Sequence, residues 1–157
     1  SASMQAVTRG RYFEEFTVGE RFVTRGRTIT EADIVAFAAL TGDYNPLHVD
    51  AEFAKKTQFG ERIAHGMLGA SYAVGLIAAL GLTEGTVIAI VNMTWDFTAP
   101  IKIGDTIHVD QTVKSMRETK KTDRGIIIFE VKLINQRGEV VQKGERVLLV
   151  SRKPGQR

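Results

Sequence analysis

Two side chains with the chemistry to activate water lie close together in the first third of the chain. Asp43 and His48 are five positions apart, on either side of an Asn45-Pro46 step. In a regular helix five residues would leave the two side chains roughly 140° apart around the axis, and a proline disfavours helix at the residue before it. A turn at Asn45-Pro46 would instead bring a carboxylate and an imidazole to one water molecule, a workable pair for general base catalysis. On spacing alone a structural role is favoured, with Asp43 capping a turn and His48 an ordinary, partly buried histidine.

A second feature suited to chemistry is the pair His65-Gly66, which opens a stretch without charged residues. The first amides of a helix lack partners within it, and the helix dipole makes that end electropositive, so a developing oxyanion would be stabilised there. Gly66 has no Cβ, which lets a carbonyl group approach its amide closely. One such donor is worth roughly 3 to 4 kcal/mol of barrier. A plain loop-to-helix junction explains the glycine equally well.

The element that must present Asp43 is a short amphipathic helix over residues 31–41. Thr30 and Asp33 have the spacing of a capping box at its start, and Gly42 stands where a left-handed C-terminal residue is expected. Residues 42–65 then form a mixed excursion of loop and short helix, and long excursions of this kind tend to carry binding or catalysis.

Within that excursion one helical turn is expected from Asp50, as N-cap, through Lys56. The apolar stretch at 66–80 follows. Counted as 63–82 it is long enough to be offered as a membrane span, but it contains His65, Ser71 and four glycines, with ordinary polar sequence on both sides. We therefore expect a buried central helix of a soluble core.

The second half of the chain changes to β-branched and alternating residues, which indicate strands. Four are expected, and residues 20–28 supply a fifth; the four span 86–98, 105–117, 125–135 and 139–150. The breaks between them are short and rich in turn residues, which favours antiparallel neighbours. The expected architecture is α+β, with one long helix covering one face of a strongly bent sheet.

Composition restricts the function classes. The chain of 157 residues has a formal net charge of +3 and no cysteine, which excludes a disulfide framework, a thiolate metal cage and a cysteine nucleophile. We expect one domain over 4–157, with Ser1-Ala2-Ser3 an expression scar, and a cytoplasmic location because no targeting segment is evident. The three histidines do not form a metal signature, and no phosphate-binding glycine loop or nucleophile elbow is present.

Three segments of this sequence together resemble a known family. They are Asp33-x-x-x-Phe37-Ala38-x-x-Thr41-Gly42-Asp43-x-Asn45-Pro46-Leu47-His48, Ile63-Ala64-His65-Gly66-Met67-Leu68, and Phe97-Thr98-Ala99-Pro100 before Gly104-Asp105. The chain resembles the MaoC-like (R)-specific enoyl-CoA hydratases over roughly residues 12–150. The resemblance implies a hotdog fold: a bent five-stranded antiparallel sheet wrapped around a long central helix, with an overhanging segment of loop and short helix.

The resemblance also implies a reaction. Members of the family add water syn across a trans-2-enoyl thioester to give the (3R)-hydroxyacyl thioester, without metal or redox cofactor. By resemblance Asp43 takes a proton from water, His48 orients that water and helps deliver the proton to Cα, and Gly66 supplies the amide for the thioester oxygen. With the resemblance added, a catalytic role for Asp43 and His48 is favoured over a structural one, because these residues and Gly66 together provide water activation and enolate stabilisation.

Further expectations concern the partners of the chain. The residues expected to contact substrate are Asn45, Ser71, Met67 and Tyr72. The substrate is expected to be an acyl-CoA or acyl-carrier-protein thioester, with a homodimer or dimer of dimers as the assembly and no nucleic acid or membrane as partner.

Two alternatives remain open. A hotdog thioesterase would direct the activated water to the carbonyl carbon, and a non-catalytic subunit of a heterodimeric dehydratase would retain only the fold.

Overall fold

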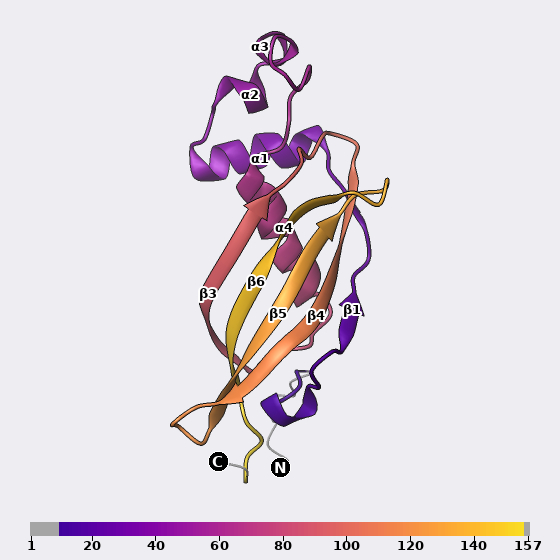
Figure 1. Ribbon diagram of the computed structural model, residues 1–157. Helices are drawn as coiled ribbons and strands as arrows, with labels where there is room; N and C mark the ends of the chain where they lie inside the picture. Colours follow the sequence, from indigo (N-terminus) through magenta and orange to yellow (C-terminus); the bar gives the residue numbers. More distant parts are fainter. Residues whose placement is uncertain (1–9, 156–157) are drawn as a thin grey trace, which may run out of the picture.

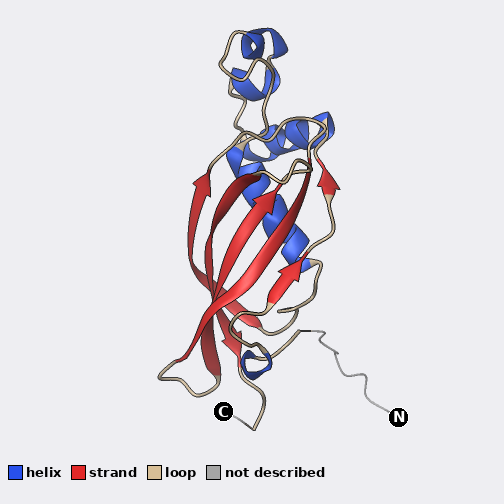
Figure 2. Ribbon diagram, turned by 45° about the vertical axis from the view of Figure 1, so that its right-hand side comes forward, coloured by secondary structure: helices blue, strands red, loops and turns tan. Residues whose placement is uncertain are grey.

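The computed structural model describes residues 10–155, so the expected scar at 1–3 lies outside the described part of the chain. A curved sheet wraps around one long helix, α4, as Figure 1 and Figure 2 show. The helical elements are η1 (Phe13–Glu15), α1 (Glu31–Thr41), α2 (Pro46–Val49), α3 (Ala51–Lys55) and α4 (Gly66–Ala78). The strands are β1 (Arg21–Val23), β2 (Arg27–Thr28), β3 (Val87–Phe97), β4 (Thr106–Glu118), β5 (Arg124–Ile134) and β6 (Val140–Ser151).

The sheet is antiparallel throughout, in the order β1-β4-β5-β6-β3, and β2 also pairs with β4. The bounds of the four long strands differ by only one residue from those expected from alternation. Strand β3 comes first in sequence among the four but lies at the edge of the sheet, paired with β6. This topology confirms the expected α+β arrangement and leaves one side of β3 without a strand neighbour in the described chain.

The strand expected over residues 20–28 is divided into β1 and β2, so the sheet has six strands rather than five. Thr24 lies at the division. Its amide donates to the Val109 carbonyl at 2.9 Å, but the Val109 amide donates to the Thr24 hydroxyl, also at 2.9 Å, rather than to a main-chain carbonyl. A side chain thereby replaces one bond of the backbone ladder, and the pairing with β4 stops and resumes at Arg27.

The core lies between α4 and the inner face of the sheet. Leu68, Ala73, Leu76 and Ile77 of α4 are buried against alternate residues of the long strands. Fully burying an aliphatic side chain of this kind contributes about 1.5 to 3 kcal/mol. The buried strand residues on this face are Ile107, Val109, Val113, Ile127, Phe129, Val131, Leu133, Val141, Leu148 and Val150.

Helix α4 is central, but only one of its faces is buried by the chain itself. Met67, Ser71, Gly75 and Ala78 are exposed and follow one another at helical spacing along the opposite side. The expectation of a helix buried all round therefore needs correction. No helix in residues 10–155 is long and apolar enough to cross a membrane.

Helix α1 begins and ends as its sequence predicts. The Thr30 hydroxyl accepts from the Asp33 amide at 3.3 Å, the Asp33 carboxylate accepts from the Thr30 amide at 2.8 Å, and Gly42 is left-handed with φ 79°. The chain then leaves the body of the molecule, and α2 and α3 lie beyond α1 at one end (Figure 1). From this overhang the chain returns to the N-terminus of α4.

Candidate active site

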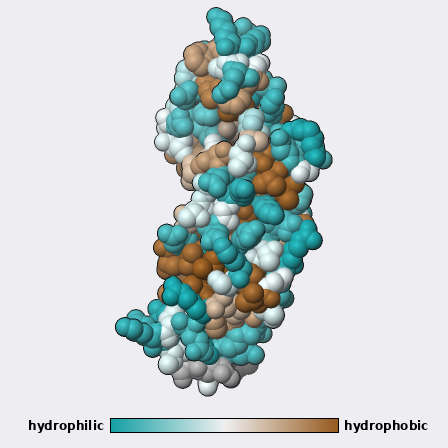
Figure 3. Space-filling model, viewed as in Figure 1, coloured by the Kyte–Doolittle hydropathy of each residue, from teal (hydrophilic) through white to brown (hydrophobic). Residues whose placement is uncertain are grey.

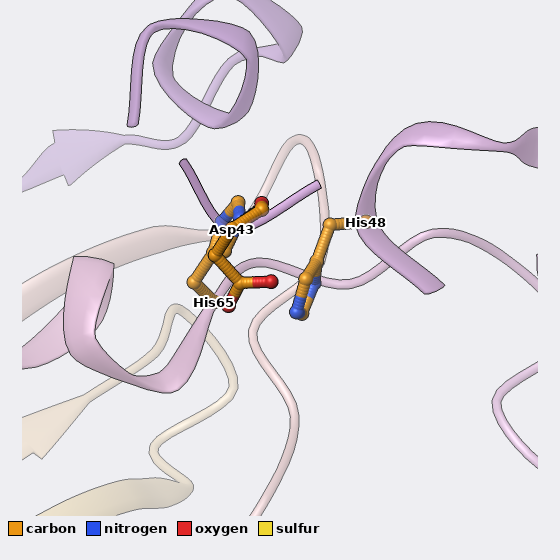
Figure 4. A group of neighbouring side chains, drawn as sticks. All are labelled: Asp43, His48 and His65. Atoms are coloured by element: carbon orange, nitrogen blue, oxygen red, sulfur yellow. Dashed lines mark hydrogen bonds between the residues drawn. The ribbon is translucent and has the colours of Figure 1, made fainter. Parts of the chain in front are cut away.

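Three side chains meet where the overhang returns to α4. Asp43, His48 and His65 each offer a polar atom, and these atoms all lie within 4.8 Å of one another. Figure 4 shows the Asp43 carboxylate directed toward the His48 ring, with His65 beside both. The convergence of Asp43 and His48 that the Asn45-Pro46 step suggested is therefore present in the structure.

Asp43 is held by local turn chemistry just after the end of α1. Its Oδ1 accepts from the Asn45 amide at 3.2 Å, and its own amide donates to the Thr41 hydroxyl at 3.2 Å. Asp43 is exposed in the single chain. One carboxylate oxygen is thus used for positioning, while Oδ2 makes no hydrogen bond within the described chain and can accept a proton.

His48 lies on α2, and the Ile63 carbonyl determines which of its ring nitrogens carries the hydrogen. Asn45 is the N-cap of α2, with its side chain accepting from the Leu47 amide at 3.1 Å, and Pro46 occupies the first helical position. The Nδ1 atom of His48 lies 2.8 Å from the Ile63 carbonyl oxygen, so Nδ1 is the donor. In the neutral ring Nε2 then carries the lone pair, available to a water molecule.

His65 is the N-cap of α4 and is 3% exposed. Its Nε2–H donates to the backbone carbonyl of Asp43 at 2.9 Å, and its ring stacks on His48 with centroids 3.9 Å apart. The edge of the Phe37 ring packs near it, at 5.1 Å between centroids. The remaining nitrogen, Nδ1, is buried without a hydrogen-bond partner among the described residues. His65 therefore links the two residues of the dyad.

Gly66 opens α4 directly beside this cluster. The first bond of the helix runs from the Leu68 amide to the His65 carbonyl at 3.0 Å, so the Gly66 and Met67 amides precede it and have no partner in the described chain. A Cβ on Gly66 would lie 2.9 Å from the Phe97 ring. Both amides belong to the electropositive end of a helix, the arrangement expected of an oxyanion-binding site.

Two cavities meet at these residues. One, of about 340 Å³, is mainly apolar, and the other, of about 310 Å³, contains the polar cluster. His48, Gly66 and Phe97 line both. The first is completed by Phe59, Ile63, Ala64, Thr98, Ala99, Pro100, Ile101 and Gln142, and the second by Phe37, Thr41, Asp43, His65 and Met67. The two cavities therefore adjoin at His48, Gly66 and Phe97, an arrangement with room for an elongated ligand.

The other predicted substrate contacts are placed differently. Met67 lines the cavity that holds the dyad, whereas Asn45, Ser71 and Tyr72 line neither cavity. Asn45 caps α2, Ser71 lies on the exposed side of α4, and the Tyr72 hydroxyl donates to Asp33 Oδ1 at 2.7 Å. In the single chain the structure brings together Asp43, His48, Gly66 and Met67 only.

Among the residues that line the two cavities, His65, Phe97 and Gln142 were given no role of their own from the sequence. His65 precedes Gly66 in the segment that opens the apolar helix, and this adjacency was the available signal. Phe97 and Gln142 reach the site only through strands β3 and β6, far from the dyad in sequence.

The three side chains also have the composition of a metal site, but their geometry suits proton transfer better. Zinc held tetrahedrally at about 2.0 to 2.1 Å needs ligand atoms roughly 3.4 Å apart. Here the His48 and His65 planes are inclined by only 26°, so the rings direct their lone pairs from two nearly parallel planes rather than toward one point.

Comparison with known proteins gives matches over most of the chain. The family model described as "MaoC like domain" matches residues 14–132. A 3-hydroxybutyryl-CoA dehydratase from Methylorubrum extorquens is 35% identical over 90% of this chain and 85% of its own length. An (R)-specific enoyl-CoA hydratase from Rhodospirillum rubrum is 37% identical, over 88% of this chain and 91% of its own length.

Solved structures give the same result at the level of the fold. The crystal structure of a MaoC-like dehydratase from Rhodospirillum rubrum superposes with a TM-score of 0.85 and 33% identity, covering 92% of this chain and 99% of that one. A protein from Mycobacterium tuberculosis described as a double hotdog fold aligns at a TM-score of 0.78 with 19% identity, covering 92% of this chain and 45% of that one. The described chain therefore has the hotdog fold.

Proposed function

Because the chain belongs to the MaoC-like domain family, we propose that it is an (R)-specific enoyl-CoA hydratase, which adds water reversibly across a trans-2-enoyl thioester. The observation that carries the proposal is the convergence of Asp43 and the free nitrogen of His48 beside the first amides of α4. Its relatives include a protein named for hydration and one named for the reverse dehydration of a short 3-hydroxyacyl-CoA.

In the proposed reaction a water molecule lies between the Asp43 carboxylate and His48 Nε2. Asp43 takes one proton as the water oxygen forms a bond to Cβ of the enoyl group, and the π electrons move toward the thioester carbonyl. His48 Nε2 accepts a hydrogen bond from this water and orients it, and the proton that Asp43 has taken passes to Cα with the help of His48, so that both hydrogens and the oxygen of one water are accounted for in the product. Because Asp43 and His48 face the same volume, both new bonds form on one face of the alkene, which is syn addition.

Negative charge on the thioester oxygen is the second requirement of the reaction. The Gly66 N–H, with the neighbouring Met67 N–H, is oriented by α4 before the substrate arrives, and such preorganised donors act mainly on the transition state. The absence of a Cβ at Gly66 leaves room between the amide and the Phe97 ring for the carbonyl group.

The decisive test is hydration of crotonyl-CoA, followed by loss of the enone absorbance. We expect Asp43→Asn and His48→Gln each to lower kcat by a factor of about 10² to 10⁴. Asp96→Asn is a matched control, since Asp96 is exposed on the outer side of the sheet and outside both cavities. Unchanged kcat in Asp43→Asn would remove the catalytic assignment.

Product analysis separates hydration from thioester hydrolysis. A hydratase yields 3-hydroxybutyryl-CoA of (3R) configuration and releases no thiol, whereas a thioesterase releases free CoA, which a thiol reagent detects. Release of CoA at the rate of substrate loss would establish the alternative. Enoyl groups presented on acyl carrier protein in place of CoA, and a series of chain lengths, would then define the thioester class.

A second copy of this chain is the proposed partner. Strand β3 is an edge strand whose apolar side chains Val87, Ile88, Ile90 and Val91 are each 42 to 52% exposed. Figure 3 shows hydrophobic residues gathered along the side of the molecule on which β3 lies in Figure 1. An exposed apolar edge of this length requires covering.

Light scattering after size exclusion tests the assembly. We expect a mass of twice 17.3 kDa or a multiple of it, and we expect Ile90→Lys to shift the protein toward the monomer. A wild-type protein that is monomeric at micromolar concentration would contradict the proposal. A cytoplasmic location remains a prediction from the sequence.

A further inference from the structure

One buried amide side chain connects the sheet to the start of α4. Gln142 lies on β6, is 2% exposed and lines the mainly apolar cavity. Its Oε1 accepts from the indole N–H of Trp95 on β3 at 2.8 Å, and its Nε2 donates to the Gly66 carbonyl at 3.0 Å. Both ends of the amide are therefore used, and one of them holds the residue proposed to stabilise the oxyanion.

The orientation of this amide is determined by Trp95. An indole N–H can only donate, so the atom facing it must be the amide oxygen. The NH2 group is consequently directed at Gly66, whose carbonyl can only accept. Trp95 thus makes Gln142 a donor toward α4 and prevents the reversed arrangement.

The first turn of α4 is built to receive this side chain. A Cβ on Gly69 would lie 2.5 Å from Gln142 Nε2 and 2.6 Å from the Ile101 side chain. Gly69 therefore has to be a residue without a side chain for Gln142 to reach Gly66. The close approach indicates a specific contact rather than a chance neighbour.

Glycine at the donor position creates a need for such a contact. Glycine can adopt a wider range of φ and ψ angles than any other residue type, and Gly66 lies at a helix end where no preceding helical turn restrains it. The Gly66 carbonyl lies in the same peptide unit as the Met67 N–H, so a bond that holds this carbonyl fixes the direction of the Met67 N–H directly. The Gly66 N–H lies in the preceding peptide unit, which is joined to it at the Gly66 Cα. A displacement of about 1 Å in a catalytic group lowers rates by a factor on the order of 10².

We propose that Gln142, oriented by Trp95, is a positioning residue that holds the Gly66–Met67 peptide unit so that the free N–H groups at the start of α4 face the thioester oxygen of the substrate. The inference rests on the proposed hydratase function and deepens it. The two hydrogen bonds from Trp95 to Gln142 and from Gln142 to Gly66 are expected to stabilise the transition state, and so to affect kcat rather than substrate affinity.

Gln142→Glu gives the sharpest test, because a carboxyl group can imitate the amide in only one protonation state. When protonated, it accepts from Trp95 and donates its O–H to the Gly66 carbonyl. When ionised, it has no donor and repels that carbonyl. Since burial raises the pKa of a carboxyl group, the replacement is protonated in mild acid and loses its proton as the pH rises.

We therefore expect the ratio of variant to wild-type kcat to be near one at the acid end and to fall about tenfold or more with increasing pH, while KM for crotonyl-CoA changes less than about threefold. Gln142→Leu lacks a donor at every pH, so its kcat ratio should be low throughout. Gln111→Glu is the matched control: Gln111 is 1% exposed on β4, two strands away from β6, and lines neither cavity. Its kcat ratio should not follow pH.

Trp95→Phe supplies an independent measurement if the Gln142 variants do not fold. It keeps a ring but removes the N–H that orients the amide, and we expect a smaller loss of kcat with KM retained. A pH-independent ratio in folded Gln142→Glu, or wild-type kcat in Trp95→Phe, would overturn the inference while leaving wild-type hydration intact. Lack of hydration by the wild-type protein would instead overturn the proposed function itself.

Discussion

The imidazole rings of His48 and His65 stack face to face, with centroids 3.9 Å apart and planes inclined by 26° (Figure 4). Each ring donates one N–H to a backbone carbonyl, His48 to Ile63 and His65 to Asp43. The stack therefore fixes the His48 ring from one side while His65 holds the backbone that carries the Asp43 carboxylate. One buried histidine therefore contacts both members of the proposed dyad and restrains their positions.

The first prediction concerns His65→Phe, which retains an aromatic ring for stacking and removes the N–H that holds Asp43. A neutral hydrogen bond contributes about 0.5 to 1.5 kcal/mol, so we expect kcat to fall by about 3- to 10-fold. Thermal unfolding should change little, because the substitution also removes the buried Nδ1 that has no partner in the described chain. Steady-state kinetics and calorimetry measure the two effects separately.

A comparison variant for this prediction is His108→Phe, which changes a partly buried histidine on β4, away from the site. Its kcat should stay at the wild-type value. Equal kcat in His65→Phe and wild type would show that the Asp43 backbone is held adequately by its own turn.

The second prediction concerns the space in front of the Gly66 amide. In Gly66→Ala the new methyl group would lie 2.9 Å from the Phe97 ring, so the ring and the methyl group together obstruct the carbonyl site. We expect kcat/KM to fall by a factor of about 10² although the N–H is still present. Adding Phe97→Ala to this variant should recover part of the activity, because it removes the obstructing ring.

If the double variant were no better than Gly66→Ala, the loss would arise from the backbone of α4 rather than from obstruction. Phe97→Ala alone supplies the reference for the comparison, as the cost of losing that ring must be subtracted.

Much of the scaffold could be predicted from the sequence because its signals are local. The Thr30–Asp33 capping box and the left-handed Gly42 involve residues a few positions apart, and alternation in the long strands reflects burial of one face. The membrane alternative for the apolar stretch was correctly set aside, since α4 spans only 13 residues. The division of residues 20–28 into two strands depends instead on the hydrogen bond between the Val109 amide and the Thr24 hydroxyl. These residues are 85 positions apart, so no local sequence pattern reveals the contact.

The approach of Asp43 to His48 could be predicted from the Asn45-Pro46 step, but the elements that bring the two side chains together could not. Pro46 was taken as evidence against helix at Asn45, and Asn45 is indeed not helical. A short helix, α2, begins one residue later, at Pro46 itself. Asn45 is extended, with ψ 132°, as the residue before a proline prefers, and is therefore an N-cap from which α2 begins at Pro46. The contact of Gln142 with Gly66 joins residues 76 positions apart, and such a contact depends on sheet register rather than on local sequence.

The third prediction concerns Tyr72, one of the residues expected to contact substrate. In the structure its hydroxyl donates to Asp33 at 2.7 Å, and the Arg27 guanidinium lies 4.0 Å from its ring centre. Burial, followed by the bond to Asp33, raises the pKa of the Tyr72 hydroxyl. Tyr72→Phe should lower the free energy of unfolding in urea by about 1.5 to 3 kcal/mol, the range for hydrogen bonds to charged groups.

Kinetics on the same variant decide between the two roles of Tyr72. An unchanged KM for crotonyl-CoA supports the structural role, whereas a raised KM with little loss of stability supports substrate contact. Tyr44→Phe serves as control, since the Tyr44 side chain is largely exposed.

The last prediction concerns stability in acid and depends on Asp105, which is 4% exposed at the start of β4. Burial alone would raise the pKa of this carboxyl, but hydrogen bonds from the Gln136 amide, the Lys102 backbone N–H and Arg137 outweigh it, and the pKa is lowered from 3.8. The folded state therefore favours the ionised form. Its stabilising effect is fully present above about pH 4 and is lost as the pH falls through the lowered pKa.

Asp105→Asn should expose this dependence. The amide cannot accept all three bonds, so at pH 7 we expect the free energy of unfolding to fall by about 2 kcal/mol. Below pH 3.8 the carboxyl of wild-type Asp105 becomes protonated first in the unfolded chain, and then in the folded protein at its lowered pKa. The difference in free energy of unfolding between wild type and Asp105→Asn should therefore narrow as the pH falls. Urea unfolding at pH 7, 5, 4 and 3 measures this convergence, with the exposed Asp96→Asn as reference. Parallel curves for wild type and Asp105→Asn would mean that packing around residue 105, rather than the charge of its carboxylate, stabilises the junction between Lys102 and β4.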